Sequence, residues 1–345
     1  MQENTMNLSE VTKFIGTCGS DITTVIVGEP GTGKSSILST LAKQYPTHTP
    51  VYIDAPVTDV PELGMPAVIE GRTISALHEQ WVLDKPAIFM IDEIGKMVGI
   101  TKLVMTRFML ERNMLGHNIH PDSIIFGTSN LATDGVGDAF PAHMNNRVTK
   151  IQLAKPTADE WTHWGADNGI DPLVLAWVDQ YPQAFGTYLD ASEKENPYIF
   201  NPKSNAGAFV SPRSLEKASH IIKRRSIIGN QSTALALVGT VGNSAAKDMA
   251  AFFSLADALE KYATIEANPE TAKIPTNVAA RLMMVFGLNA RVTDKTLEAH
   301  LTYVKRMPEE MQAVWGRNLV RSSKAGVAMS VRSFAQWAAG IGALL

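Results

Sequence analysis

Cysteine is almost missing from this sequence of 345 residues. The single one, Cys18, cannot form an intrachain disulfide, which excludes a disulfide-stapled secreted scaffold. Charged residues are also few, at 19%, whereas disordered chains carry an excess of charge. Lys and Arg (31) do not outnumber Asp and Glu (34), and the net charge of −3 argues against bulk electrostatic binding to nucleic acid.

Long apolar runs are absent as well. None reaches the roughly 18 residues that a membrane-spanning helix needs, and the tail FAQWAAGIGALL at 334–345 indicates a packed terminal helix. The first residues, MQENTMNLSEVTKF, lack the apolar centre of a signal peptide. We therefore expect a cytoplasmic protein without a membrane segment.

The first 155 residues alternate between two textures. Nearly continuous apolar runs, typical of strands buried on both faces, are separated by helical patterns. This alternation predicts an α/β fold, with a parallel five-stranded sheet between two layers of helices. The runs are 23–29, 50–55, 86–93, 122–130 and 149–154, and the helical patterns are 35–45, 74–83 and 102–115.

The texture changes after Lys155, where no further strand is expected. Helices are predicted at 155–169, 171–181, 211–225, 231–239 and 244–262, with a loop at 184–210 and a linker at 263–276. Residues 277–345 again have a helical pattern. Three parts follow from this division: an αβα core at 1–155, an all-α domain at 156–262 with a loop insertion at about 184–210, and a helical segment of unassigned role at 263–345.

A glycine-rich segment, GEPGTGKSS, joins the first apolar run to the first helical pattern. The spacing Gly28-x-x-x-x-Gly33-Lys34-Ser35 in a strand–loop–helix context is that of a phosphate-binding P-loop. Its backbone N–H groups and the helix N-terminus attract phosphate oxygens. Lys34 is expected to reach the β- and γ-phosphates of ATP, and Ser35 to bind Mg²⁺. The residues expected to line the nucleotide are Gly28, Glu29, Pro30, Gly31, Thr32, Gly33, Lys34, Ser35 and Ser36.

Two acids, Asp92 and Glu93, end the apolar run IFMIDE. The carboxyl ends of parallel strands are where open α/β sheets bind ligands. We expect Asp92 to hold Mg²⁺, directly or through water, and Glu93 to polarise the attacking water. The alternative, that both acids cap a turn, loses weight beside a P-loop.

Three further polar residues stand at expected element ends. Asn130 follows the fourth apolar run, where its amide suits both a γ-phosphate and a water, although Asn is also a common turn residue. Arg147 precedes the fifth run, and Arg213 lies in the first turn of a predicted helix. Arginine suits bidentate phosphate contacts, yet either one taken alone is as readily a surface charge.

The order of these parts resembles the AAA+ ATPases over about residues 20–262. The helix start SPR and the segment DGVGDAFPAHMNNRV resemble the MoxR-like branch and its phage and prophage relatives. The resemblance implies a sheet order of 5-1-4-3-2, with 156–262 as the lid domain. It assigns Asn130 as sensor 1, Arg147 as the arginine finger and Arg213 as sensor 2. Two segments depart from the family: 111–123 leaves room only for a short hairpin, and 55–73 occupies the place of a helix insert without an aromatic residue.

The resemblance also implies a ring of six identical subunits, with ATP at each boundary, in the cytoplasm of the cell or of a phage host. MoxR-like proteins remodel partner proteins, often ones that carry a von Willebrand A domain, and this is the first functional hypothesis. A nucleic-acid motor or helicase loader and a weakly hydrolysing assembly module are the alternatives. The basic triplet 223–225 suits phosphate, but such a triplet at a helix end also complements the helix dipole.

Overall fold

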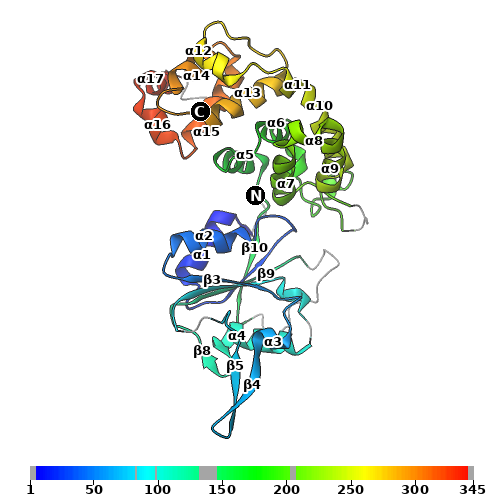
Figure 1. Ribbon diagram of the computed structural model, residues 1–345, viewed down its shortest axis with the longest axis vertical. Coiled ribbons are helices and arrows are strands. Elements are labelled where there is room, and N and C mark those ends of the chain that lie inside the picture. Colours follow the sequence, from blue (N-terminus) through cyan, green and yellow to red (C-terminus); the bar gives the residue numbers. More distant parts are fainter. Residues whose placement is uncertain (1–4, 82–83, 98, 132–145, 203–206, 341–345) are drawn as a thin grey trace. The chain divides into compact units, whose positions relative to one another are not determined.

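The computed structural model describes residues 5–81, 84–97, 99–131, 146–202 and 207–340. The chain folds into two compact units, Met1–Pro156 and Thr157–Leu345 (Figure 1). The first is built around a parallel sheet, and the described part of the second contains helices and loops but no strand. The predicted α/β core followed by a helical region is therefore confirmed.

All six strands of the central sheet run parallel, in the order β1-β10-β2-β9-β6-β3. Five of them are the predicted strands in the expected order 5-1-4-3-2. The sixth, β1, is an addition that pairs only two residues with β10 at the edge. The strands are β1 (Thr5–Met6), β2 (Thr24–Val27), β3 (Thr49–Asp54), β6 (Ala87–Asp92), β9 (Ile124–Ser129) and β10 (Thr149–Leu153).

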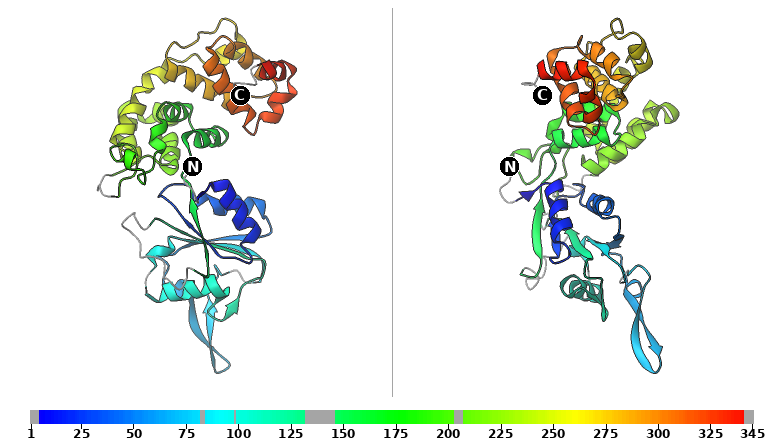
Figure 2. Two further views of the ribbon diagram at one scale, coloured as in Figure 1. Left: turned by 180° about the vertical axis from the view of Figure 1, so that it is seen from behind. Right: turned by 90° about the vertical axis from the view of Figure 1, so that its left-hand side faces the viewer.

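Helices cover both faces of this sheet (Figures 1 and 2). Helices α1 (Leu8–Cys18) and α2 (Ser36–Gln44) lie on one face and α4 (Gly99–Glu111) on the other. Successive residues of β6 point to opposite faces, so Met90 packs in the first core and Phe89 in the second. Burial on both sides explains why the strand sequences are continuously apolar.

A long antiparallel hairpin replaces the helix predicted at 74–83. Strands β4 (Gly64–Ile69) and β5 (Arg72–Leu77) pair from end to end and extend away from the central sheet (Figure 2). The turn residues Glu70 and Gly71 have φ of 51° and 74°, as a type I′ turn requires. The helix prediction was wrong because this turn and the β-branched residues that follow it favour a hairpin over the weak helical pattern. A short helix, α3 (Val60–Leu63), precedes β4.

The helix predicted at 102–115 ends earlier, at Glu111. Arg112 adopts the left-handed conformation, with φ of 52°, and this stops the helix. The next residues form a small hairpin, β7 (Asn113–Met114) with β8 (His117–Asn118), which agrees with the short hairpin expected in this segment.

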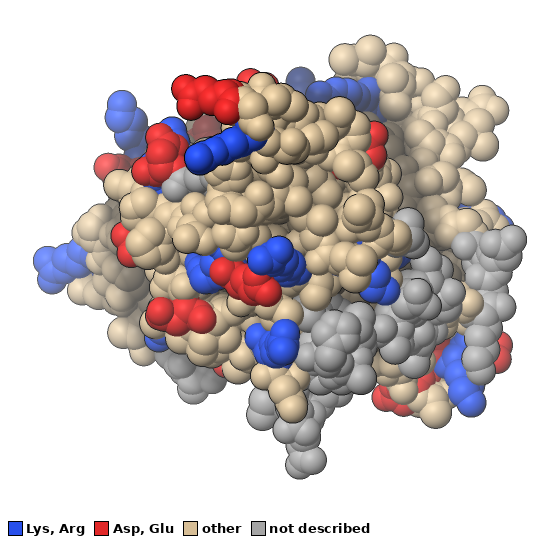
Figure 3. Space-filling model, turned by 90° about the horizontal axis from the view of Figure 1, so that it is seen from below, with Lys and Arg blue, Asp and Glu red and all other residues tan. Residues whose placement is uncertain are grey.

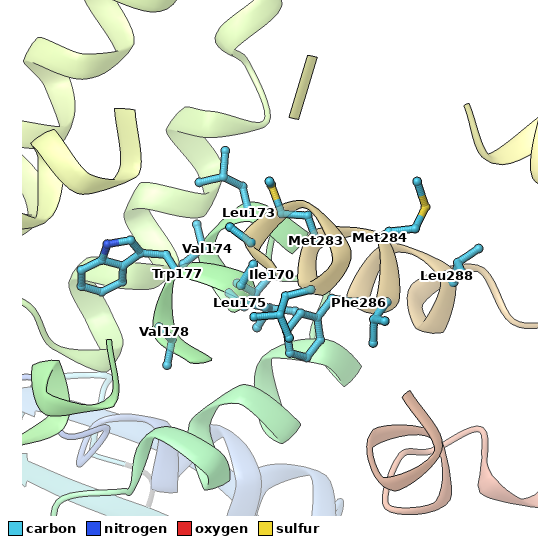
Figure 4. Close-up of a cluster of buried hydrophobic side chains, with 14 of the residues drawn as sticks. Ile170, Leu173, Val174, Leu175, Trp177, Val178, Met283, Met284, Phe286 and Leu288 are labelled. Atoms are coloured by element: carbon cyan, nitrogen blue, oxygen red, sulfur yellow. The ribbon is translucent and has the colours of Figure 1, made fainter. Parts of the chain in front are cut away.

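The second unit is a helical assembly with one continuous core. Helices α6 and α13 cross at its centre, where Trp177, Val178, Met283 and Phe286 are buried (Figure 4). The core draws on residues from Trp161 to Ala338, so the C-terminal helices share it. The helices are α5 (Ala158–Asp167), α6 (Pro172–Gln180), α7 (Pro212–Ile222), α8 (Arg225–Ile228), α9 (Asn230–Val241), α10 (Asn243–Ala251), α11 (Phe253–Asp257), α12 (Tyr262–Ala267), α13 (Val278–Arg291), α14 (Leu297–Val304), α15 (Glu309–Val320), α16 (Ala325–Ser330) and α17 (Arg332–Gly340).

Two predictions in this unit need correction. The single helix expected at 244–262 is broken at Phe252, whose N–H bonds Met249 O three residues back, and the break leaves both Phe252 and Phe253 buried. The expected linker at 263–276 begins inside helix α12, because Ile265 is fully buried in the core. Among the described residues, no helix is both long enough and apolar enough to cross a membrane.

Candidate active site

The loop between β2 and α2 has the backbone of a phosphate cradle. Gly31 and Gly33 have φ of 77° and 94°, in the left-handed region that favours glycine. The Thr32 hydroxyl donates to Glu29 O at 2.9 Å, and Ser36 N–H donates to Gly33 O at 2.9 Å. These bonds close the loop tightly at the first turn of α2, where helix N–H groups point outward.

Lys34 connects this loop to the tip of a neighbouring strand. Its side chain is buried, and its ammonium donates to Gly28 O at 2.7 Å, to Glu29 O at 2.8 Å and to Asn130 Oδ1 at 3.0 Å. Strands β2 and β9 pair side by side with Val27 opposite Ser129, so Asn130 is the first residue beyond the end of β9. The structure therefore brings two of the predicted site residues into direct contact.

Asp92 lies at the carboxyl end of β6, one strand further along the sheet. Its Oδ1 accepts a hydrogen bond from Thr128 on β9, and its Oδ2 accepts one from the Tyr52 hydroxyl on β3 at 3.0 Å. Burial raises the pKa of Tyr52 to about 12, and the hydrogen bond to Asp92 adds to the shift. Both oxygens of the carboxylate are thus fixed by hydroxyl donors from the two flanking strands.

Glu93 has an unusual backbone conformation for a residue with a side chain. Its φ of 54° is in the left-handed region, which costs about 1 kcal/mol for a residue other than glycine. Its N–H donates to Thr128 Oγ1 at 3.3 Å, and its carboxylate forms an ion pair with Lys96 in the following 3₁₀ turn, Ile94–Lys96. The chain turns sharply after Asp92, so the two adjacent acids take different directions.

Glu29 sits inside the phosphate loop but is buried. Its Oε2 lies 3.6 Å from Lys155 Nζ, just beyond the end of β10. A buried carboxylate needs such a partner because an unpaired charge is costly in a dry environment. The pair ties the loop to β10, so Glu29 has a structural contact beside its predicted place at the nucleotide.

The two predicted arginines lie apart from this cluster in the chain. Arg147 is exposed directly before β10, while most of the segment that precedes it, 132–145, lies outside the described residues. Arg213 lies in the first turn of α7 in the second unit, behind the N-cap Ser211. The helix start predicted from SPR is therefore present, and the roles of both arginines stay predictions.

Tyr52 and Thr128 were not identified from the sequence. Each lies on the same strand face as a recognised or neighbouring polar residue: Tyr52 two residues before Asp54, and Thr128 two before Asn130. Hydroxyl residues at this spacing before a strand end were the available signal.

The donor set at this edge fits a hard cation. Asp92 offers carboxylate oxygens and Ser35 a hydroxyl, which are oxygen ligands of the kind that Mg²⁺ takes beside substrate phosphates. No group of three or more His, Cys, Asp or Glu side chains among the described residues forms an all-protein metal cage. That combination suits a cation that shares its ligands between protein and nucleotide.

A phosphate loop after β2, acids at the tip of β6 and Asn130 beyond β9 define a P-loop nucleotide-binding protein. Residues 24–151 match the family model described as "ATPase family associated with various cellular activities (AAA)". This part of the chain is an AAA ATPase domain, and the protein is an ATPase.

Solved structures of three other proteins are similar over most of the chain. RuvB of Thermotoga maritima, a Holliday junction branch migration motor, is 11% identical over 86% of this chain and 89% of its own, with a TM-score of 0.39. A putative ATPase from Cytophaga hutchinsonii is 14% identical over 89% and 79%, with a TM-score of 0.34. NtrX from Brucella abortus is 13% identical over 96% and 68%, with a TM-score of 0.34. A comparison with the curated proteins gave no match.

Proposed function

We propose that the protein works as a subunit of an AAA+ ring that couples Mg²⁺-dependent ATP hydrolysis to the remodelling of a partner protein. The observation that supports this best is the contact of Lys34 with Asn130 beside the Asp92–Glu93 tip. It joins the phosphate loop and two strand ends at one edge of the sheet, where a triphosphate has both cationic and polar partners.

Each residue at this edge has a proposed task. The loop N–H groups and Lys34 bind the phosphates, and Ser35 and Asp92 hold Mg²⁺. The chemistry that bound Mg²⁺ supplies is neutralisation of charge on the phosphate oxygens. Glu93 orients the attacking water for an in-line displacement, and Asn130 holds the water and the γ-phosphate in register.

The ring and the lid complete the proposal. Arg147 acts as a finger on the nucleotide of a neighbouring subunit, which makes hydrolysis depend on assembly into a ring of six. Residues 156–262 act as the lid, with Arg213 as its phosphate sensor. We place the protein in the MoxR-like branch, in the cytoplasm, with a client or a von Willebrand A-domain protein as its partner.

The β4–β5 hairpin favours a protein client over nucleic acid. Met65, Val68, Ile69 and Ile74 on it are all more than 40% exposed, an apolar set that suits contact with a polypeptide. A groove for nucleic acid needs clustered positive charge. On the face in Figure 3, the described Lys and Arg are instead interspersed with Asp and Glu on a mainly uncharged surface.

The test is to find what stimulates turnover. A Glu93→Gln subunit with ATP is used to trap partners, which are then purified and added to the wild-type protein. Stimulation by such a protein, lost in Val68→Ser/Ile69→Ser but kept in the matched control Val57→Ser outside the hairpin, supports remodelling. Stimulation by DNA instead, falling steeply with salt, would show a nucleic-acid motor. Slow turnover in assembled rings with either addition would show an assembly module.

A further inference from the structure

Tyr52 occupies a place that its packing does not explain. It lies on β3 at the edge of the sheet, where Val51 and Ile53 point into the core beneath α4. Tyr52 points to the opposite face, with half of its surface (50%) exposed. A large side chain that is half exposed gains little from burial, so its hydroxyl is the informative part of the residue.

That hydroxyl has a defined partner. In the register of β3 and β6, Tyr52 pairs with Met90 and Asp54 with Asp92, so Tyr52 reaches Asp92 diagonally on the same face. The Tyr52 hydroxyl donates to Asp92 Oδ2 at 3.0 Å, while Thr128 donates to Oδ1 from the other side. Each carboxylate oxygen has a second lone pair and can accept another bond or bind a cation.

The register also puts like charges side by side. Asp54 is directly opposite Asp92, and two carboxylates in this position repel each other. A hydroxyl donor on Asp92 offsets this repulsion without adding a positive charge that would compete with a cation. A lysine in its place would neutralise the carboxylate and weaken metal binding.

We propose that Tyr52 is a positioning residue that orients the Asp92 carboxylate for Mg²⁺ at the nucleotide. This inference rests on the proposed role of Asp92. Tyr52 contacts neither nucleotide nor water in this scheme and acts through Asp92 alone. Partners of metal ligands that fix their orientation are worth roughly 10–100-fold in metal affinity.

The test measures Mn²⁺ binding with ADP by electron paramagnetic resonance, comparing wild type with Tyr52→Phe. We expect the Mn²⁺ dissociation constant to rise about tenfold in Tyr52→Phe, with ADP affinity in EDTA unchanged. The Mg²⁺ concentration for half-maximal ATPase activity should rise in parallel, and saturating Mg²⁺ should restore kcat. The matched control is Tyr45→Phe, which removes the hydroxyl that donates to Gly16 O at 2.7 Å, away from the site.

The two ideas fail differently. Equal Mn²⁺ affinity in wild type and Tyr52→Phe, with ADP present, would overturn the role of Tyr52 alone. A wild-type protein that binds no Mn²⁺ with ADP would overturn the metal site and the role of Tyr52 with it. A loss of kcat in Tyr52→Phe that saturating Mg²⁺ does not restore would show that Tyr52 acts other than through the cation.

Discussion

The ammonium of Lys34 lies 3.0 Å from Asn130 Oδ1, and this contact joins the phosphate loop to the end of β9. The same ammonium bonds two carbonyl oxygens of its own loop, at Gly28 and Glu29. A γ-phosphate that binds here competes for this ammonium, so Asn130 can detect its arrival through Lys34. The contact gives a direct route by which the strand end responds to the nucleotide.

Replacing Lys34 should abolish most nucleotide binding. Charge-assisted hydrogen bonds are worth about 1.5–3 kcal/mol each, so losing its phosphate contacts in Lys34→Ala should weaken ATP binding at least tenfold to a hundredfold. Titration with a fluorescent ATP analogue measures this. Lys43→Met, on the exposed last turn of α2, is the matched control. Equal affinity in Lys34→Ala and wild type would contradict the phosphate-binding role.

Replacing Glu93 should separate binding from turnover. Glu93→Gln keeps the shape of the side chain but removes the carboxylate that orients the water, so we expect normal ATP binding and a loss of about 10²–10⁴-fold in kcat. Single-turnover release of phosphate measures the chemical step. Glu111→Gln, on the exposed end of α4, should behave as wild type. Normal hydrolysis by Glu93→Gln would assign the water to another residue.

The sequence predicted the parallel core well because burial on both faces makes its strands continuously apolar. The hairpin at 64–77 escaped prediction for the opposite reason. Its strands are exposed on both sides, so no alternation of apolar and polar residues marks them. Only the Glu70-Gly71 turn pointed to a hairpin, and it lacks the common Asn-Gly or Asp-Gly pair.

The site was predictable only where it carries a sequence pattern. Lys34 and Asp92 stand at fixed positions relative to glycines and a buried strand, so they could be named from spacing. Tyr52 and Thr128 meet Asp92 from different strands, and that meeting depends on strand register, which spacing along the chain does not encode. The left-handed backbone at Glu93 is likewise a property of the folded loop.

Arg147 should act between subunits. Arg147→Ala should bind ATP with wild-type affinity, since its own phosphate loop is intact, but lose roughly 10³-fold in turnover. Mixing it with Lys34→Ala subunits places an intact arginine beside an intact loop at some boundaries, so part of the activity should return. Turnover measured across mixing ratios checks this. A mixture no more active than its parts would mean that Arg147 does not serve a neighbour's nucleotide.

Acid should weaken the second unit through His300. This side chain on α14 is fully buried, and its Nε2 lies 3.3 Å from Glu266 Oε1. Burial lowers the pKa of His300, opposed by the hydrogen bond and charge of Glu266 and assisted by Arg291 and Lys324.

Because the unfolded chain takes up this proton near the ordinary pKa of 6.5 and the folded chain only at a lower pH, the folded state binds fewer protons between the two values. The stabilisation is complete above 6.5 and is lost as the pH falls from there towards the lowered pKa, by up to ~1.4 kcal/mol per pH unit. Urea unfolding followed by tryptophan fluorescence at several pH values should show this slope in the wild type and a smaller one in His300→Gln. His220→Gln, an exposed histidine on α7, is the control and should keep the slope. Identical slopes in His300→Gln and wild type would show that His300 is not the titrating group.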